Sequence, residues 1–351
     1  MIIGVPKERK VHEYRVALTP QAVRVLIQNG HRVILEKNAG AGCGNNDEEF
    51  KAAGAEIVEN EEDVFVKSEL IVKVKEPIPS EFNLLRKGQV IFSYLHLAAS
   101  GELVEALEKS GVTAIAFETV ELPDRSLPLL SPMSRIAGRL SIQVGIRFLE
   151  KTVGGKGVLI SGAPGVKPGK VTVIGGGTVG YNAVLSALRL GADVVLVDIN
   201  PKKLEFFHEE FGGLVKTVPS YPELIREELR DSDLVVGAVL VTGVKAPRVI
   251  TREMISGIEK GSVFVDVAID QGGCSETSRP TGLDNPTFNV DGVVHYCVTN
   301  IPSLVSRTAS YSLSNAILPY VLRIAEGKIE EDEPLKKGIN VNNGKLLLRM
   351  S

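Results

Sequence analysis

The chain contains 351 residues, of which 44% are hydrophobic, and its 40 basic and 43 acidic side chains give a formal net charge of −3. Such a length predicts about two domains and a large buried core. Without an excess of basic charge, we expect neither a nucleic acid nor a membrane surface as a partner. The first residues contain no secretory apolar region and no apolar run approaches the ~20 residues of a membrane span, so we expect a soluble cytoplasmic protein.

The first third of the chain alternates strand and helix signals, which is typical of a parallel sheet. Thr19 and Pro20 are expected to cap a helix, with proline in its first turn, that ends near Asn29 and Gly30. Asp47 is expected to cap a second helix, which ends at Ala53, and a third helix follows over residues 100–110. Buried strands are expected at residues 2–5, 32–36, 70–74, 90–94 and 112–117.

A glycine motif follows the apolar strand at residues 170–174. Gly175, Gly177 and Gly180 have the G-x-G-x-x-G spacing of a dinucleotide-binding turn. Gly175 allows the chain to turn off the strand, Gly177 allows backbone to approach a pyrophosphate, and Gly180 allows the next helix to pack on the sheet. A turn that binds nothing is the alternative, because any tight strand-to-helix connection favours glycine.

The next strand supports the dinucleotide interpretation. Residues 193–197 form an apolar run that ends on Asp198, about 20 residues after the glycines. A carboxylate there is placed to accept hydrogen bonds from the adenosine ribose hydroxyls, and it repels a 2′-phosphate. The motif therefore favours NAD over NADP as the cofactor.

Two long helices, at residues 134–151 and 306–325, bracket this dinucleotide unit. Further strands are expected at residues 234–241, 262–267, 293–298 and 345–349. We predict an α/β protein with two Rossmann-like domains, each built on a parallel sheet. The N-terminal domain is expected to be discontinuous, comprising residues 1–128 and 308–351, with the NAD-binding domain at residues 129–307.

Polar side chains that could carry chemistry lie at the ends of predicted strands, where open α/β sheets bind ligands. His96 and Lys75 each follow a buried strand, and Asp270 ends a strand and turn within the dinucleotide unit. Arg15 lies in a basic loop after the first strand, and its planar fork suits bidentate binding of a carboxylate. A structural histidine and solvated basic side chains are the alternatives for the first domain. The three cysteines match neither a zinc nor a disulfide pattern.

Five separated motifs carry a resemblance to a known family. They are Lys7-Glu-Arg with Arg15-Val-Ala-Leu-Thr-Pro20, Val72-Lys-Val-Lys-Glu-Pro77, Tyr94-Leu-His-Leu-Ala98, Ile174-Gly-Gly-Gly-Thr-Val-Gly180 and Val265-Asp-Val-Ala-Ile-Asp-Gln-Gly-Gly-Cys274. Through these motifs, which run in register along almost the whole chain, it resembles the alanine dehydrogenase family. The resemblance implies NAD-dependent oxidative deamination of L-alanine to pyruvate and ammonium, the reverse reductive amination, and a homo-oligomer that is a hexamer.

The resemblance also assigns roles to matching positions. Arg15 would bind the substrate carboxylate, Lys75 its carbonyl or amine end, and His96 and Asp270 would form the acid/base pair. The remaining positions would contact the cofactor; they are Ser134, Gly175, Gly177, Thr178, Val179, Gly180, Asp198, Lys203, Ser220, Val239, Leu240, Val267, Ala268, Ile269, Asp270, Arg279, Val298, Thr299, Asn300 and Ile301.

The chain departs from the family pattern at three places. Gly282 and Leu283 stand where the family usually has a Thr-His pair, and Ile301 replaces the methionine of an Asn-Met-Pro run. Both changes lie near the expected nicotinamide position, so they bear on cofactor affinity and substrate range. Some members bind a metal through a late histidine; Gly327 stands near that position here, so we expect no metal.

Two other functions are alternatives to the dehydrogenase. The soluble NAD-binding component of a nicotinamide nucleotide transhydrogenase is a relative that lacks matches at Lys75 and His96, and it has Arg-Ala-Gln-Ser-Met-Asp where this chain has Ser-Pro-Met-Ser-Arg-Ile at residues 131–136. A non-catalytic NAD-binding regulator would keep the glycines but would not require polar side chains at four strand ends. Both comparisons favour the dehydrogenase.

Overall fold

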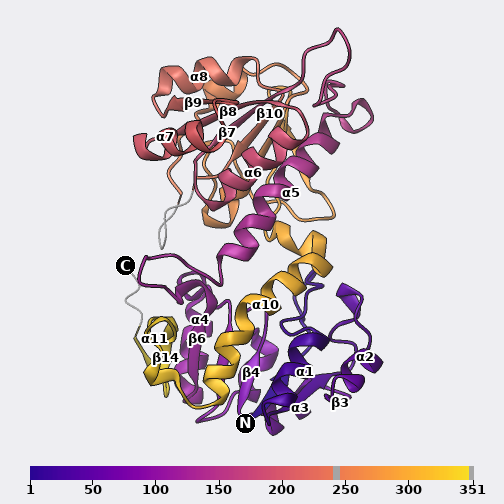
Figure 1. The fold of residues 1–351 in the computed structure, drawn as a ribbon, viewed down its shortest axis with the longest axis vertical. Helices are drawn as coiled ribbons and strands as arrows, with labels where there is room; N and C mark the ends of the chain where they lie inside the picture. Colours follow the sequence, from indigo (N-terminus) through magenta and orange to yellow (C-terminus); the bar gives the residue numbers. More distant parts are fainter. Residues whose placement is uncertain (240–245, 348–351) are drawn as a thin grey trace. The chain divides into compact units, whose positions relative to one another are not determined.

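The computed structural model describes residues 1–239 and 246–347. It divides into two compact units, each an α/β structure (Figure 1). Unit 1 consists of Met1–Met133 and Ser303–Ser351, and unit 2 of Ser134–Pro302. The predicted fold class is confirmed, including an N-terminal unit that the C-terminal segment completes.

Unit 1 is built on an eight-stranded sheet with the order β15-β14-β6-β5-β4-β1-β2-β3. Strands β1 to β6 are all parallel, whereas β14 is antiparallel to β6 and β15 to β14. Because β1 lies between β2 and β4, the strand order reverses there, which creates a ligand-binding edge at the carboxyl ends of β1 and β4. The strands are β1 Ile2–Val5, β2 Arg32–Glu36, β3 Glu56–Val58, β4 Leu70–Val72, β5 Val90–Ser93, β6 Thr113–Ala116, β14 Ile339–Asn342 and β15 Lys345–Leu346.

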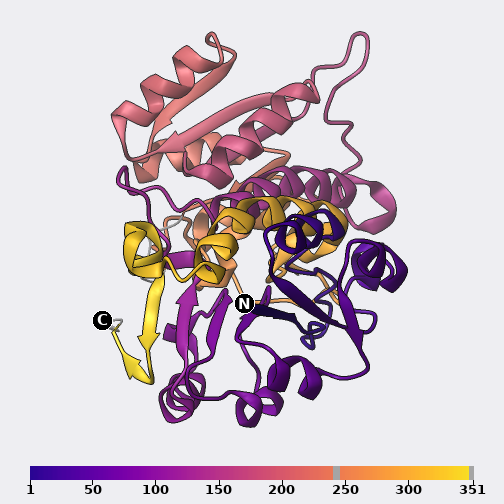
Figure 2. The same cartoon turned by 60° about the horizontal axis from the view of Figure 1, so that its bottom comes forward.

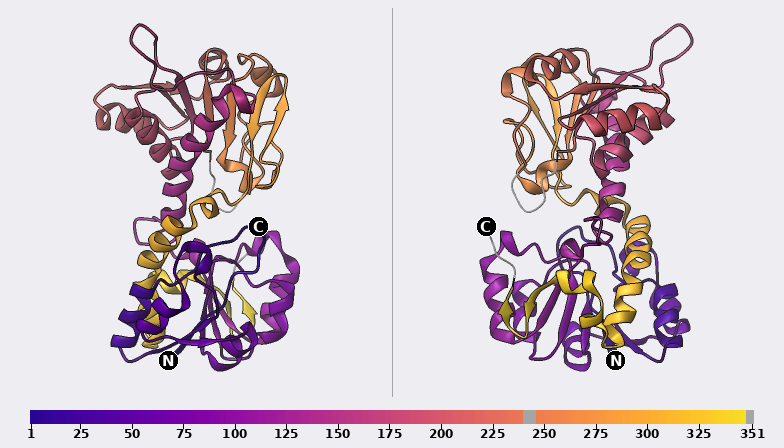
Figure 3. Two further views of the ribbon diagram at one scale, coloured as in Figure 1. Left: turned by 90° about the vertical axis from the view of Figure 1, so that its right-hand side faces the viewer. Right: turned by 60° about the vertical axis from the view of Figure 1, so that its left-hand side comes forward.

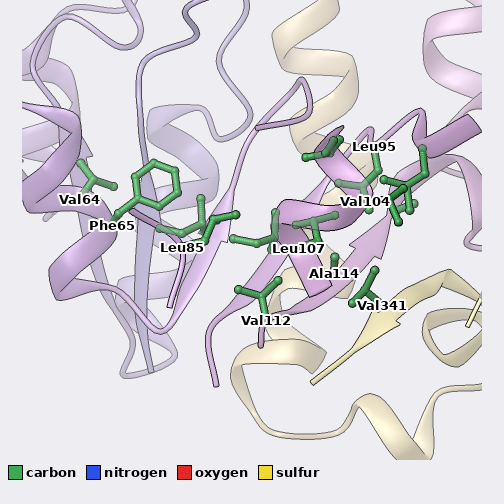
Figure 4. Close-up of a cluster of buried hydrophobic side chains, with 14 of the residues drawn as sticks. Val64, Phe65, Leu85, Leu95, Val104, Leu107, Val112, Ala114 and Val341 are labelled. Carbon is green, nitrogen blue, oxygen red and sulfur yellow. The ribbon is translucent and has the colours of Figure 1, made fainter. Parts of the chain in front are cut away.

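Amphipathic helices cover this sheet. In α4, Leu103, Val104 and Leu107 are buried at helical spacing, and Ser100 caps the helix by accepting from the Leu103 N–H. These side chains pack into an apolar cluster that also contains Leu95, at the carboxyl end of β5 (Figure 4). The helices of unit 1 are α1 Pro20–Gln28, α2 Asp47–Ala52, α3 Glu61–Lys67, α4 Gly101–Ser110, α10 Ser306–Ala325 and α11 Glu333–Gly338, and α5 Ser131–Leu149 begins there and continues into unit 2.

The C-terminal segment is tied to the N-terminal segment of unit 1 by buried hydrogen bonds. The backbone N–H of Val16 donates to Ser310 Oγ and that of Thr19 to Ser314 Oγ, both at 3.0 Å. Helix α10 packs beside α1 (Figure 3), and β14 extends the sheet by pairing with β6 (Figure 2). These bonds satisfy backbone groups that burial would otherwise leave unpaired.

Unit 2 is built on a seven-stranded sheet with the order β12-β13-β11-β10-β7-β8-β9, parallel except for β12. The strand order again reverses between β7 and β10, directly beside the glycine motif. The strands are β7 Lys170–Ile174, β8 Asp193–Asp198, β9 Val215–Pro219, β10 Leu234–Gly237, β11 Val263–Asp266, β12 Thr287–Val290 and β13 Val293–Tyr296. The helices that follow α5 are α6 Thr178–Arg189, α7 Pro201–Glu210, α8 Pro222–Arg230 and α9 Arg252–Ser256.

One predicted helix cap is wrong, and another is in the predicted place without a side-chain hydrogen bond. Asn46, not Asp47, caps α2: its side chain accepts from the Glu49 N–H at 2.9 Å, while Glu49 accepts from the Asn46 N–H at 2.7 Å. Thr19 is the N-cap residue of α1, as predicted, but among the described residues its side chain accepts no capping hydrogen bond. Its hydroxyl lies 3.2 Å from Ser314 Oγ.

Several predicted bounds also differ. β4 ends at Val72 and β10 at Gly237, both earlier than expected, and α5 begins at Ser131. The ends of the strands expected at 234–241 and 345–349 lie outside the described residues. Among the helices of the described residues, none is long and apolar enough to cross a membrane.

Candidate active site

Arg15 lies after β1 and is held by a neighbouring acid. Its Nε and Nη2 donate to the two carboxyl oxygens of Glu13 at 2.6 and 2.5 Å, and its Nη1 lies 3.1 Å from Met133 Sδ. The Arg15 side chain is 2% exposed and that of Glu13 is fully buried. Burial lowers the pKa of Arg15, but the hydrogen bonds and charge of Glu13 outweigh this and raise the pKa above its ordinary value. The alternative of a solvated basic loop is therefore wrong for Arg15.

Lys75 is half-buried and follows β4. A buried carboxyl, Glu8, accepts the Val74 N–H at 2.6 Å and lies 3.4 Å from the Lys75 N–H. Burial raises the pKa of Glu8 to about 7, against the opposing charge of Lys73. Lys73 in turn forms a buried ion pair with Glu81. The backbone that carries Lys75 is thus fixed by a buried carboxyl group inside the unit.

His96 directly follows Leu95 after β5, and its backbone has a left-handed conformation with φ 48° and ψ 40°. The Tyr94 ring stacks on the imidazole, with ring centroids 5.9 Å apart and 13° between the planes. Glu118 accepts the backbone N–H of His96 at 2.7 Å and that of Leu95 at 3.0 Å. The His96 side chain is 44% exposed, so the imidazole is accessible to a small molecule.

The sheet of unit 1 brings these three predicted residues to one edge. Arg15, Lys75 and His96 follow β1, β4 and β5, whose carboxyl ends lie side by side in a parallel arrangement. They also share neighbours, since Tyr94 stacks on His96 and lies within electrostatic reach of Arg15, as does Glu8. A guanidinium, an ammonium and an imidazole gathered at one sheet edge suit a small anionic substrate that exchanges protons.

In unit 2, the three motif glycines have different steric roles. Gly175 has φ 104°, and a Cβ there would lie 2.7 Å from the Ala238 carbonyl oxygen. A Cβ on Gly180 would lie 1.8 Å from the Gly175 carbonyl oxygen, whereas one on Gly177 would meet no described atom within 4 Å. Gly177 is the N-cap of α6 and has no side chain to occupy the helix N-terminus. Backbone N–H groups at such a terminus bind phosphate.

Asp198 connects the glycine loop to the second strand. Its carboxyl accepts the Gly176 N–H at 2.6 Å and the Asn200 N–H at 2.8 Å, and its carbonyl accepts the Ser220 N–H at 3.1 Å. The Lys203 Nζ lies 3.7 Å from the same carboxyl. The structure therefore brings together Asp198, Lys203 and Ser220, which were predicted separately along the sequence.

Asp270 is exposed on a 3-10 turn, Val267–Gln271, that follows β11. Asp266 organises this turn: its carboxyl accepts the Ala268 N–H at 3.0 Å, the Cys274 N–H at 2.9 Å and the Ser278 hydroxyl. Burial raises the pKa of Asp266 even though these donors act in the opposite direction. The buried carboxyl thus holds the turn while Asp270 projects outward.

The other cofactor candidates surround this turn. Asn300, with φ 58°, donates its N–H to Asp270 at 3.2 Å, and Thr281 pairs with Val298 in an isolated bridge. The Arg279 guanidinium lies over the Phe288 ring, 4.3 Å from its centroid. The predicted positions on or near this turn also include Val267, Ala268, Ile269, Thr299 and Ile301. Elsewhere in unit 2, Ser134 lies on α5, Thr178 and Val179 begin α6, and Val239 follows β10. Leu240 lies outside the described residues.

His96 belongs to unit 1 and Asp270 to unit 2. Sequence reasoning missed four acids that hold the candidate residues: Glu8, Glu13, Glu118 and Asp266. A signal existed for Glu118 and Asp266, because both follow or end a buried strand, as His96 does. For Glu13, the only indication of the ion pair in the sequence is that it lies two residues before Arg15.

The three cysteines, Cys43, Cys274 and Cys297, are buried free thiols. Burial raises the pKa of Cys297 to about 12, which makes it an inert thiol. Over residues 1–239 and 246–347, no group of three or more His, Cys, Asp or Glu side chains is placed to hold a metal ion.

Comparison with known proteins gives matches along nearly the whole chain. The family model "Alanine dehydrogenase/PNT, N-terminal domain" matches residues 4–137, and its C-terminal counterpart matches residues 141–349. An alanine dehydrogenase of Methanococcus maripaludis is 50% identical over 351 residues, covering 99% of this chain and 94% of that protein.

Among solved structures, an alanine dehydrogenase is more similar to this chain than a transhydrogenase is. An L-alanine dehydrogenase has 49% sequence identity and a TM-score of 0.97, covering 99% of this chain and 97% of the other. A transhydrogenase from Sinorhizobium meliloti has 26% identity and a TM-score of 0.87, covering all of both chains.

Proposed function

The chain belongs to the alanine dehydrogenase/PNT family, and we propose that it catalyses the NAD-dependent oxidative deamination of L-alanine to pyruvate and ammonium, and the reverse reductive amination. One observation carries the proposal: an alanine dehydrogenase shares 50% identity with 99% of the chain, whereas the transhydrogenase shares 26%. The choice of NAD, the use of ammonium, a hexameric assembly and a cytoplasmic location are parts of the proposal.

The glycine loop of unit 2 fits a dinucleotide. The N-terminus of α6 at Gly177 would hold the pyrophosphate, and Asp198 would accept the ribose hydroxyls, which favours NAD over its 2′-phosphorylated form. Lys203 and Ser220 lie beside Asp198 and would complete this end of the site. When bound, NAD supplies the acceptor for the hydride from the alanine Cα. Asp270 and Asn300 would lie at the nicotinamide end.

The unit 1 residues would bind the substrate and move its protons. Arg15 would pair with the carboxylate, and Lys75 would hold the carbonyl oxygen or the amine. His96, accessible at the sheet edge, would take a proton from the substrate ammonium group and release it to solvent before hydride transfer. It would then take a proton from the water that adds to the iminium carbon and return it to the nitrogen that leaves as ammonia. Asp270 would orient that water. These groups account for binding, orientation and proton transfer, which general acid–base catalysis requires.

The first test adds NAD⁺ and L-alanine to the purified protein and follows NADH absorbance, with NADP⁺ and L-glutamate as parallel substitutes. We expect rapid NADH formation that depends on alanine and on NAD⁺. NAD binding without alanine oxidation would contradict the proposal and favour the transhydrogenase component, which has the same fold at lower identity.

The role of His96 is tested by His96→Ala. We expect the kcat for alanine oxidation to fall by ~10²–10⁴, because a positioned acid/base group typically contributes that much. His208→Ala is the matched control, since His208 is exposed on α7 in unit 2 and has no proposed role. Near-full activity of His96→Ala would exclude His96 from proton transfer.

Assembly needs a separate measurement. The hexamer rests on the family resemblance alone. Light scattering on the protein as it elutes from a size-exclusion column measures the mass of the assembly directly. A mass of about six chains supports this part of the proposal, and any other mass contradicts it while leaving the reaction unaffected.

A further inference from the structure

His96 has a backbone conformation that a residue with a side chain seldom adopts. Its φ of 48° lies in the left-handed region, and its N–H points to the same side as that of Leu95. Such a conformation costs about 1 kcal/mol or more and persists only where surrounding contacts enforce it. A neighbouring group must therefore enforce the left-handed conformation of His96, the predicted proton-transfer residue.

Glu118 is placed to do this. It lies on the 3-10 turn Phe117–Thr119, directly after β6, and β6 pairs in parallel with β5, which leads to His96. The register pairs Ser93 with Ala116, which are the last residues of the two strands. His96 and Glu118 therefore both lie just past the carboxyl ends of adjacent strands. This topology brings a glutamate and a histidine together although 22 positions separate them in the chain.

The hydrogen bonds go to the backbone of the histidine segment. One carboxyl oxygen, Glu118 Oε1, accepts the His96 N–H at 2.7 Å and the Leu95 N–H at 3.0 Å, and Oε2 lies 3.3 Å from the Leu95 N–H. The same Oε1 is 4.0 Å from His96 Nδ1, which is beyond hydrogen-bond distance. The Glu118 side chain is 20% exposed, so it lies mostly inside the unit. Two converging donors require an acceptor, and Glu118 supplies it.

We propose that Glu118 is a positioning residue for His96, fixing the imidazole at the sheet edge by accepting the backbone N–H groups of Leu95 and His96. This inference rests on the proposed function, because it gives His96 its proton-transfer role. Glu118 acts through the backbone and does not itself touch the substrate. Stacking of Tyr94 on the imidazole then fixes the ring plane, and Leu95 is anchored in the apolar cluster below.

A purely structural role is the alternative, in which Glu118 only stabilises the end of β6. The two roles differ in their kinetics. A misplaced acid/base group slows the chemical step without weakening substrate binding, and displacement by about 1 Å can cost ~10²-fold in rate. A structural role predicts a loss that is the same whether or not His96 is present.

The experiment compares Glu118→Ala, Glu118→Gln and the double variant with His96→Ala in alanine oxidation. We expect Glu118→Ala to lower kcat by about 10–100-fold with the KM for alanine changed by less than about threefold. Glu118→Gln keeps a carbonyl acceptor for both N–H groups, so it is expected to recover kcat to within about fivefold of wild type. Glu121→Ala is the matched control, because Glu121 lies three residues on and pairs with Lys337.

The double variant decides between the roles. If Glu118 acts through His96, adding Glu118→Ala to His96→Ala should slow the enzyme no further. A further 10-fold loss in the double variant, wild-type kcat in Glu118→Ala, or a loss confined to KM would each overturn the proposal.

Amide hydrogen exchange gives a readout that does not depend on activity. Exchange at Leu95 and His96 should become at least about 10-fold faster in Glu118→Ala and stay near the wild-type rate in Glu118→Gln. Unchanged exchange in Glu118→Ala would overturn the proposed hydrogen bonds. If wild type formed no NADH with alanine, the proposed function would fall, and the exchange rates would still decide whether Glu118 holds this backbone.

Discussion

Arg15 and Glu13 form a buried ion pair between residues only two positions apart. Because both charges are inside the unit, removing one leaves the other buried without this ion pair, which typically costs several kcal/mol. The pair also fixes the plane of the guanidinium through two parallel hydrogen bonds. A fixed plane suits recognition of a second planar carboxylate, which is the role proposed for Arg15.

This arrangement predicts the effect of Arg15→Lys. A lysine ammonium is a point charge that cannot bind Glu13 and a substrate carboxylate in the same fork geometry. We expect the KM for pyruvate to rise by about 10-fold or more, measured in steady-state reductive amination, with a smaller change in kcat. Arg24→Lys on the exposed face of α1 is the control. An unchanged KM for pyruvate in Arg15→Lys would exclude the clamp role.

Glu8 predicts a pH dependence of stability. Burial raises its pKa from an ordinary 4.5 to about 7, with Lys73 acting against this shift and Glu13 and Glu81 adding to it. Between these values the folded protein holds a proton that the unfolded chain releases. Stability therefore falls as pH rises through this window, by about 3 kcal/mol in order of magnitude, and remains reduced above pH 7.

Glu8→Gln stays neutral at every pH and keeps an acceptor for the Val74 N–H. The gain in melting temperature of Glu8→Gln over wild type should be small near pH 5 and should grow up to pH 8. Glu102→Gln, exposed on α4, is expected to show no such trend. A difference between Glu8→Gln and wild type that is equal at pH 5 and pH 8 would contradict the raised pKa.

At the scale of elements, the glycine motif separates folding from binding. A Cβ on Gly180 would lie 1.8 Å from the Gly175 carbonyl oxygen, a distance that real Cβ atoms do not show. A Cβ on Gly177 would meet no described atom within 4 Å, at an ordinary φ of −80°. The fold of unit 2 therefore requires Gly180, whereas the described residues leave room for a side chain at Gly177, where the proposed cofactor would be the reason for a glycine.

Two alanine substitutions test this separation. Gly180→Ala should lower the melting temperature or prevent soluble expression, because α6 must move away from β7. Gly177→Ala should keep the wild-type melting temperature and weaken NAD binding, measured by calorimetry, by about 10-fold or more. Equal NAD affinity of Gly177→Ala and wild type would show that the pyrophosphate does not approach this residue.

Elements with strong apolar runs were predictable, and weaker ones were not. Strands β1, β2 and β7 and helix α10 have the expected bounds because their apolar residues are continuous or helically spaced. The apolar pattern of the sequence predicts neither β3, which has only three residues, nor β9, which contains Pro219. β3 and β9 are strands because they pair with β2 and β8, and the residues of β3 and β9 alone do not indicate a strand.

The candidate site was predictable in part: the residues proposed to bind and react could be predicted, but the acids that hold them could not. His96, Lys75 and Asp270 follow from strand ends, and the glycines from their spacing. The acids that hold these residues depend on which strands lie side by side, as for Glu118, whose strand β6 adjoins β5. A single sequence gives no direct measure of that adjacency, and the family resemblance assigned no role to these acids.

At the scale of the whole chain, unit 1 depends on two segments separated by unit 2. Their return was predictable from the two long bracketing helices, but the individual contacts between them were not. Thr19 and Ser314 illustrate this, since their backbone-to-hydroxyl bond joins positions 295 residues apart. Unit 1 can therefore be completed only after the second segment has been synthesised and docked.

This dependence predicts that Ser314→Ala destabilises unit 1. Ser314 is fully buried, and alanine would leave the Thr19 N–H without its acceptor at 3.0 Å, which costs about 1–3 kcal/mol. Ser312→Ala, at a half-buried position on the same helix, is expected to change stability by less than about 0.5 kcal/mol. The free energy of unfolding of both variants is measured in urea. Amide exchange at Val16 and Thr19 reports the unfolding of unit 1 itself. Equal losses in the two variants would mean that α10 is sensitive to any serine replacement, and that the hydrogen bond to Thr19 does not join the two segments.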